Sequence, residues 1–67
     1  MLDPADLIPG TFYDVTRKVH GKITGFRGRF VGRYDGDLYV FHATRKGAGS
    51  KAVFADEFVE IKKAEVV

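Results

Sequence analysis

The chain has 67 residues, no cysteine, 45% hydrophobic residues and a net charge of +2. A chain of this length makes one domain, and without cysteine it has neither disulfides nor thiolate metal sites to stabilise it. Stability must come from a compact apolar core, from oligomerisation or from both. No secretory signal and no apolar stretch of roughly 18 residues is present, so we expect a cytoplasmic protein without a membrane span. One domain is expected over residues 1–67, with residues 1–10 as a terminal plug and residues 11–64 as the body.

The charge is distributed unevenly along the chain. Residues 15–54 contain nine lysines and arginines against two aspartates, a net charge of +7, whereas residues 1–14 carry −3 and residues 55–67 carry −2. A basic centre between acidic ends favours a polyanionic partner and says little about the fold.

The N-terminal segment predicts a short helical turn followed by the first strand. Asp3 and Pro4 are residue types typical of a helix cap and a first turn. We expect Leu7 and Ile8 to plug one end of the core. Residues 11–19 are rich in β-branched and aromatic residues and predict a strand. The side chains expected to face inward on this strand are Tyr13, Val15 and Val19.

The second predicted strand, residues 23–34, is long and contains three glycines. Interior glycines mark bends, bulges or close backbone approach, so such a strand can curl to join two sheets of a small barrel. Two residue sets alternate along it. The face expected to be core consists of Phe26, Gly28, Phe30, Gly32 and Tyr34. The other face carries Arg27, Arg29, Val31 and Arg33.

Asp35-Gly36 predicts a tight turn into a third strand over residues 38–44. Asp-Gly is a strong signal for a two-residue hairpin loop. A loop of this length at Asp35-Gly36 pairs each residue of the second strand with the residue of the third strand for which the two numbers add up to 71. A three-residue loop would shift the register by one and spoil the agreement between turn and alternation, so we discount it. The predicted pairs are Gly32–Tyr39, Phe30–Phe41 and Gly28–Ala43 on the apolar face, and Arg29–His42, Val31–Val40 and Arg33–Leu38 on the other.

The C-terminal part predicts a basic loop, a short strand, one helical turn and a last strand. These elements are expected at residues 45–51, 52–54, 55–57 and 58–64. Val59 and Ile61 are expected to face inward, and residues 66–67 either fray or extend a sheet edge. Asp56 and Glu57 are expected to be solvated or to cap the helical turn rather than to act in catalysis.

This order of elements predicts an all-β fold, a small five-stranded barrel with a one-turn helix before the last strand. Residues 28–41, followed by residues 52–61, resemble the core strands of SH3-like barrels, a superfold that includes the KOW, Tudor-like and Sm-like modules. The likeness implies the fold better than the function. The OB-fold is the alternative, although it usually needs a longer chain and a helix between its third and fourth strands.

Residues 28–34 and 50–54 also resemble stretches of the small plasmid-borne dihydrofolate reductase, which is itself an SH3-like barrel. This resemblance would imply a small oligomeric enzyme. The reductase lines its pore with a Val-Gln-Ile-Tyr run, whereas residues 51–54 of this chain read Lys-Ala-Val-Phe and lack the glutamine and the tyrosine hydroxyl. The sequence contains no recognisable catalytic, cofactor or metal constellation, so we expect a protein that is not an enzyme.

The strongest functional signal is the arginine face of the long strand. Guanidinium groups at every second position can follow a nucleic-acid backbone and bind its phosphates. A merely solvated strand face is the alternative interpretation. We expect the three tyrosines to lie in the core rather than to stack on bases. The residues expected to bind nucleic acid are Arg27, Arg29, Arg33, His42, Arg45, Lys46 and Lys51.

The leading hypothesis is a module that binds RNA or DNA through backbone phosphates, without cofactor or metal. It predicts that Arg27→Ala and Arg29→Ala weaken binding. The alternative is an adaptor or inhibitor, of phage or mobile-element type, that docks on an acidic protein, because the same basic face would serve either partner. Homo-oligomerisation is compatible with both.

Overall fold

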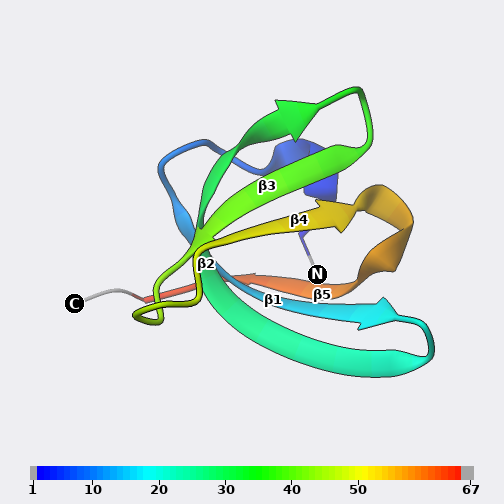
Figure 1. The fold of residues 1–67 in the computed structure, drawn as a ribbon. Helices are drawn as coiled ribbons and strands as arrows, with labels where there is room; N and C mark the ends of the chain where they lie inside the picture. Colours follow the sequence, from blue (N-terminus) through cyan, green and yellow to red (C-terminus); the bar gives the residue numbers. More distant parts are fainter. Residues whose placement is uncertain (1, 66–67) are drawn as a thin grey trace.

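The computed structural model describes residues 2–65, in which strands dominate (Figure 1). The elements are η1 (Pro4–Asp6), β1 (Phe12–Val19), β2 (Lys22–Tyr34), β3 (Leu38–Ala43), β4 (Ser50–Phe54), η2 (Ala55–Glu57) and β5 (Phe58–Lys63). The predicted all-β class, the five strands and the helical turn before the last strand are confirmed. No helix in the described part of the chain is long and apolar enough to cross a membrane. Residues 66–67, predicted to fray or to extend an edge, lie outside the described residues.

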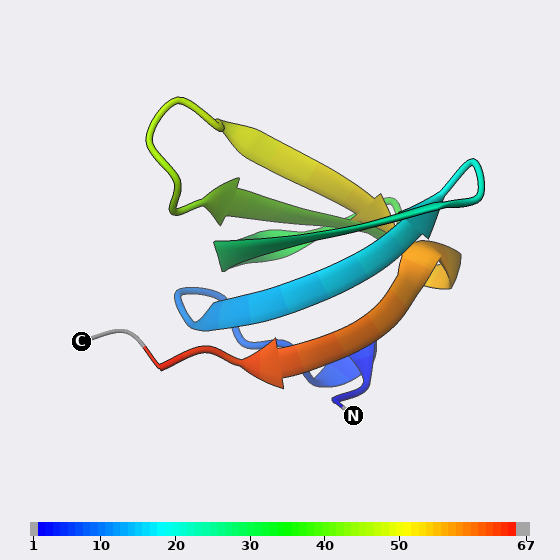
Figure 2. The same cartoon turned by 90° about the horizontal axis from the view of Figure 1, so that it is seen from below.

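The five strands form one antiparallel sheet in the order β4-β3-β2-β1-β5. Figure 2 shows β4 beside β3 and β5 beside β1, at opposite ends of this order. Within residues 2–65 no strand pairing joins β4 to β5, so the sheet curls without being closed by hydrogen bonds. The molecule is therefore a half-open barrel with two free sheet edges.

Strand β2 belongs to both halves of the curled sheet (Figure 1). It pairs with β1 along Lys22–Arg29 and with β3 along Gly28–Tyr34, so the two pairings overlap at Gly28 and Arg29. Gly28 is buried, and a Cβ placed on it would lie 3.0 Å from the carbonyl oxygen of His42. Glycine at this position therefore permits the close backbone approach at which β2 passes from one half to the other.

The loop between β2 and β3 has three residues, and the predicted two-residue loop is wrong. Tyr34 pairs with Leu38, and between them Asp35 and Gly36 adopt φ angles of 53° and 83°. Positive φ is favourable for glycine and tolerated by aspartate, so Asp-Gly does specify a turn here. The pair of residue types does not specify the length of the loop.

A bulge at Val31 compensates for the extra loop residue. The register between β2 and β3 shifts between Phe30 and Gly32, so Val31 is an extra residue on β2 that restores the predicted register from Phe30 onward. On the barrel side of the bulge, the predicted pairing of Phe30 with Phe41 is confirmed. On the loop side, the predicted pairs Gly32–Tyr39, Val31–Val40 and Arg33–Leu38 are replaced by Gly32–Val40, Arg33–Tyr39 and Tyr34–Leu38.

The core lies between the two halves of the sheet and is built around aromatic rings. Phe41 is fully buried and packs against Phe26 and Phe30, with ring centroids 5.4 Å and 5.3 Å away. Such contacts add to the large apolar area that each buried ring removes from water. The buried cluster consists of Leu7, Tyr13, Val15, Phe30, Tyr39, Phe41, Val53 and Ile61.

Three apolar side chains that were predicted to be buried are exposed. Their exposed fractions are 62% for Ile8, 51% for Tyr34 and 44% for Val59. Tyr34 changes face because the bulge reverses the alternation of β2. Val59 has no partner on β1, because the register between β1 and β5 is irregular at this point. Ile8 lies beside the plug formed by Leu7, and its N–H donates to the Tyr13 hydroxyl at 3.0 Å.

Both helical turns are fixed by carboxylates. Asp3 Oδ1 accepts the Ala5 N–H at 2.9 Å, as expected of a cap. Glu57 Oε1 accepts the Phe54 N–H at 2.9 Å, which confirms the expected capping role of Glu57. Leu2 precedes η1 and donates its N–H to the carbonyl oxygen of Ile61 on β5 at 3.3 Å.

Candidate nucleic-acid interface

Arg33 does not share a face with Arg27 and Arg29, contrary to the prediction. It pairs with Tyr39, whose side chain is buried, and residues directly opposite in an antiparallel pair lie on one face. The bulge at Val31 causes the exchange, because one extra residue reverses the alternation. Arg33 instead lines a separate hollow beside η1. The expected row of three arginines is therefore reduced to two.

Arg27 is paired with a carboxylate. Asp14 lies directly opposite on β1, and Arg27 donates from Nε to Oδ1 at 2.7 Å and from Nη2 to Oδ2 at 3.2 Å. These hydrogen bonds, assisted by the charge of the guanidinium, hold the pKa of Asp14 below its usual range and raise the pKa of Arg27. Residues 15–34 contain no aspartate or glutamate, and Asp14 directly precedes them in the sequence. Its role follows only from the register of β1 against β2.

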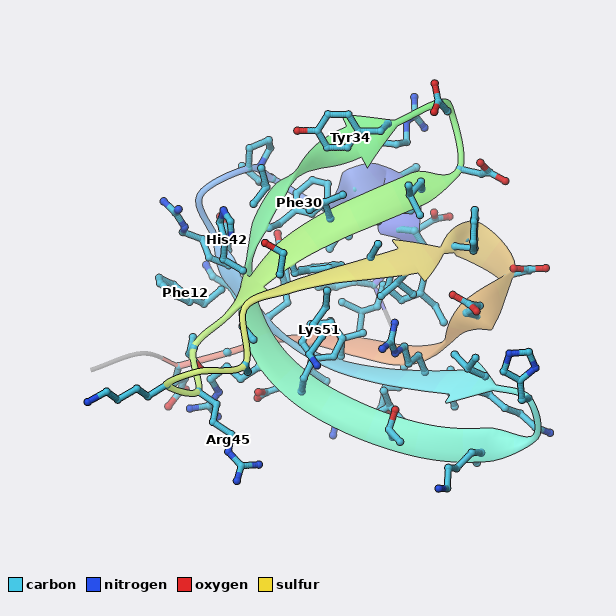
Figure 3. All side chains as sticks on the ribbon, viewed as in Figure 1. Phe12, Phe30, Tyr34, His42, Arg45 and Lys51 are labelled. Carbon is cyan, nitrogen blue, oxygen red and sulfur yellow. The ribbon has the colours of Figure 1, made fainter. Side chains whose placement is uncertain are left out.

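Arg29 is the centre of a row that crosses the outer face of the sheet. Its neighbours in register are Phe12 on β1 and His42 on β3. Figure 3 shows Phe12 and His42 pointing away from the sheet on the same side. His42 Nδ1 lies 3.0 Å from Ser50 Oγ on β4. This outer row combines a cation with two aromatic rings, and Arg29 and His42 are exposed.

Two other predicted cations line a hollow that the sequence did not identify. The hollow has a volume of about 450 Å³ and lies between the first half of β2 and the β3–β4 loop. In Figure 3, Lys51 points below β4 and Arg45 extends from the loop toward the same side. Lys46 lies exposed in the same loop. The side chains that give this cationic hollow its character are Arg17, Phe26, Arg27, Thr44, Arg45 and Lys51.

The lining of the cationic hollow is one-sided in charge. Arg17, Arg27, Arg45 and Lys51 belong to its lining, and no described lining residue is a carboxylate, although the Arg27 guanidinium is bound to Asp14 on the outer face. The cations come from segments far apart in sequence, since Arg17 lies on β1 and Lys51 on β4. Among residues 2–65 the ion pairs are Arg27–Asp14 and Lys62–Glu60, so Arg17, Arg45 and Lys51 have no carboxylate partner there.

Arg17 is the lining residue that sequence reasoning missed. It lies on the inward-facing set of β1, between Val15 and Val19, and crosses to β4, where Nη1 donates to the carbonyl oxygen of Ala52 at 2.9 Å. Its guanidinium carbon lies 5.8 Å from the centre of the Phe26 ring, within range of a cation–π contact. Its Nε is buried and has no hydrogen-bond partner within residues 2–65. The inward spacing from Val15 was the available signal in the sequence.

No protein-family model, curated protein or solved structure matches this chain. The described residues also contain no group of three histidines or carboxylates that could hold a metal ion. A function for this chain must therefore be inferred from its own residues.

Proposed function

We propose that the protein binds nucleic acid through backbone phosphates, with the cationic hollow as the principal contact. The observation that supports this proposal is the convergence of Arg17, Arg45 and Lys51 on one hollow whose described lining lacks carboxylates. Cations without a carboxylate partner repel one another when brought together, and a polyanion relieves that repulsion. Guanidinium groups suit phosphate because they can donate two parallel hydrogen bonds.

We infer further that the fold is an SH3-like barrel and that its incomplete closure creates the site. Strand β2 is shared between the two halves of the sheet, and η2 precedes the last strand. The edge of β4 then stands opposite the β1–β2 hairpin without strand pairing. The cationic hollow lies in this opening, where side chains from both halves reach one ligand.

Phosphate contacts fix the position of a nucleic acid without reading its bases. We therefore expect weak sequence preference and a steep dependence of affinity on salt, because each neutralised phosphate releases counterions. Arg29 and His42, on the outer row, would add contacts only to a ligand long enough to leave the hollow. Arg27 is held by Asp14 and would contribute less than its position suggests.

The test is a salt titration of binding to labelled single- and double-stranded DNA and RNA, followed by fluorescence anisotropy. Arg45→Ala and Lys51→Ala should each weaken binding and flatten the plot of log affinity against log salt by about 1. Arg33→Ala is the matched control, since it removes the same charge from a separate hollow.

Equal losses in all three variants would contradict the assignment to the cationic hollow. Failure to bind any nucleic acid would contradict the function itself. In that case, an acidic protein retained after nuclease treatment of a lysate would favour the adaptor hypothesis.

A further inference from the structure

A second hollow adjoins the cationic hollow along the open side of the barrel. It has a volume of about 1030 Å³ and lies between the tip of the β1–β2 hairpin and the end of β4. Arg17 and Thr24 line both hollows, and the hydrogen bond from Arg17 to Ala52 lies where they meet. The two hollows therefore adjoin on the open side between β4 and the hairpin, with Arg17 between them, and we call them together the open track.

The second hollow differs from the first in its chemistry. Its walls include the apolar side chains of Val19, Leu38 and Phe54, and we call it the apolar hollow. Phe54 lines this hollow and is 49% exposed. Arg17, His20 and Lys22 also line it. An exposed aromatic ring is a surface on which nucleobases stack, and Arg17 lines the same hollow.

The charges of the two hollows favour different parts of a nucleotide. The cationic hollow has no carboxylate in its described lining, whereas the apolar hollow includes Glu57, which accepts the Phe54 N–H. Glu57 partly offsets the charges of Arg17 and Lys22 in the apolar hollow, so this hollow attracts a phosphate less strongly than the cationic hollow does. The volume of the cationic hollow, about 450 Å³, is in the range of sites for one small ligand.

We propose that the open track binds a single strand of nucleic acid, with a phosphate in the cationic hollow and an adjoining base beside Phe54 in the apolar hollow. This inference rests on the proposed function and adds the form of the ligand. A base within a duplex has both faces covered by its neighbours and cannot reach Phe54, so the apolar hollow contributes only when the base is unpaired. Arg17, between the hollows, is positioned to contact the nucleotide from either side.

The experiment compares three fluorescent probes of one length: a single DNA strand of mixed sequence, a strand in which every base is replaced by an abasic unit, and a duplex. The whole chain should bind the mixed single strand at least about tenfold more tightly than the abasic strand, and more tightly than the duplex. Phe54→Ala should abolish the difference between the mixed and abasic strands while leaving the salt dependence unchanged.

Tyr34→Ala is the matched control, because Tyr34 is an aromatic residue of similar exposure, 51%, that lines neither hollow. It should retain the preference for the mixed strand. Phe54→Leu keeps an apolar side chain without a ring face and should lose most of the preference, which provides a second test if Phe54→Ala does not fold.

Equal affinity for the mixed and abasic strands would overturn the inference while leaving phosphate binding intact. Equal loss of the preference in the Phe54 and Tyr34 variants would also overturn it. Binding to none of the three probes would overturn both this inference and the proposed function.

Discussion

Strand β2 contains two similar triplets, Gly28-Arg29-Phe30 and Gly32-Arg33-Tyr34, whose environments differ almost completely. In the first, the glycine is buried, the arginine faces outward and the aromatic ring is 4% exposed. In the second, the glycine has open space around it, the arginine lies on the side of buried Tyr39 and the ring is 51% exposed. Val31, the bulged residue between the triplets, separates the two.

The difference shows that a residue's role on a strand depends on the path of the backbone as much as on residue type. The first triplet lies where β1, β2 and β3 meet, so Gly28 and Phe30 are buried and closely packed, while Arg29 is exposed on the outer face. The second has β3 alone as a paired neighbour. Similar residues therefore form the core and outer face at one site, and a peripheral surface at the other.

The largest expected effect is a difference in stability between alanine variants of Gly28 and Gly32, the glycines of the two triplets. Gly28→Ala places a Cβ 3.0 Å from the His42 carbonyl oxygen and 3.2 Å from the Phe41 Cβ, so it should lower the free energy of unfolding by about 1–3 kcal/mol. Gly32→Ala meets no atom within 4 Å and should change it by less than about 0.5 kcal/mol. Denaturant unfolding measures both. Equal destabilisation would show that the two halves of β2 are packed alike.

The next effect tests the loop that follows the second triplet. Gly36 has a φ angle of 83°, and alanine in a left-handed conformation costs about 1–2 kcal/mol. Gly36→Ala should therefore lower the melting temperature, whereas Asp37→Ala in the same loop should change it little. A fully stable Gly36→Ala variant would show that the loop does not require the left-handed conformation at this position.

The smallest effect on stability concerns the arginine that is paired in the first half of β2. The pKa of Asp14 is lowered by its hydrogen bonds to Arg27, so their contribution to stability is present at neutral pH and disappears as the pH falls through the depressed pKa. Asp14→Asn should thus be slightly destabilising at pH 7 and neutral in strong acid. Both side chains are largely exposed, which keeps the effect small. Unfolding measured across this pH range is the test.

Asp14→Asn should slightly lower stability but raise the affinity for nucleic acid. Arg27 lines the cationic hollow, and Asp14→Asn releases it, so affinity for nucleic acid at low salt should rise severalfold. Asp56→Asn is the control, because it removes an equal charge from η2. A similar rise in the control would mean that net charge alone determines affinity.

Much of the fold follows from local patterns in the sequence. Alternation and turn residues predicted the five strands, and Val15, Phe30, Phe41 and Ile61 were correctly placed in the core. The bulge could not be predicted, since Val31 is an ordinary strand residue and nothing in its type marks the extra position. The loop length depended on the bulge, so one missed irregularity reversed the faces predicted for Arg33 and Tyr34 at the end of β2.

The candidate site was less predictable because it depends on contacts between distant segments. Arg45 and Lys51 were identified from charge alone, without their common hollow. Arg17 acquires its position only when the inner face of β1 meets the edge of β4, and Asp14 only when β1 pairs with β2. The spacing of residues within one strand specifies neither that the edge of β4 lies near β1 nor how β1 pairs with β2.

The hydrogen bond from Arg17 to Ala52 also bears on the solubility of the protein. Exposed backbone groups on edge strands are templates for aggregation through strand addition. On β4, the Ala52 carbonyl oxygen accepts a hydrogen bond from Arg17, and the Phe54 N–H donates to Glu57. On β5, the Ile61 carbonyl oxygen accepts from the Leu2 N–H. Each free edge of the sheet thus has at least one backbone group that is already hydrogen-bonded, and on β4 one of the partners is a residue proposed to bind the ligand.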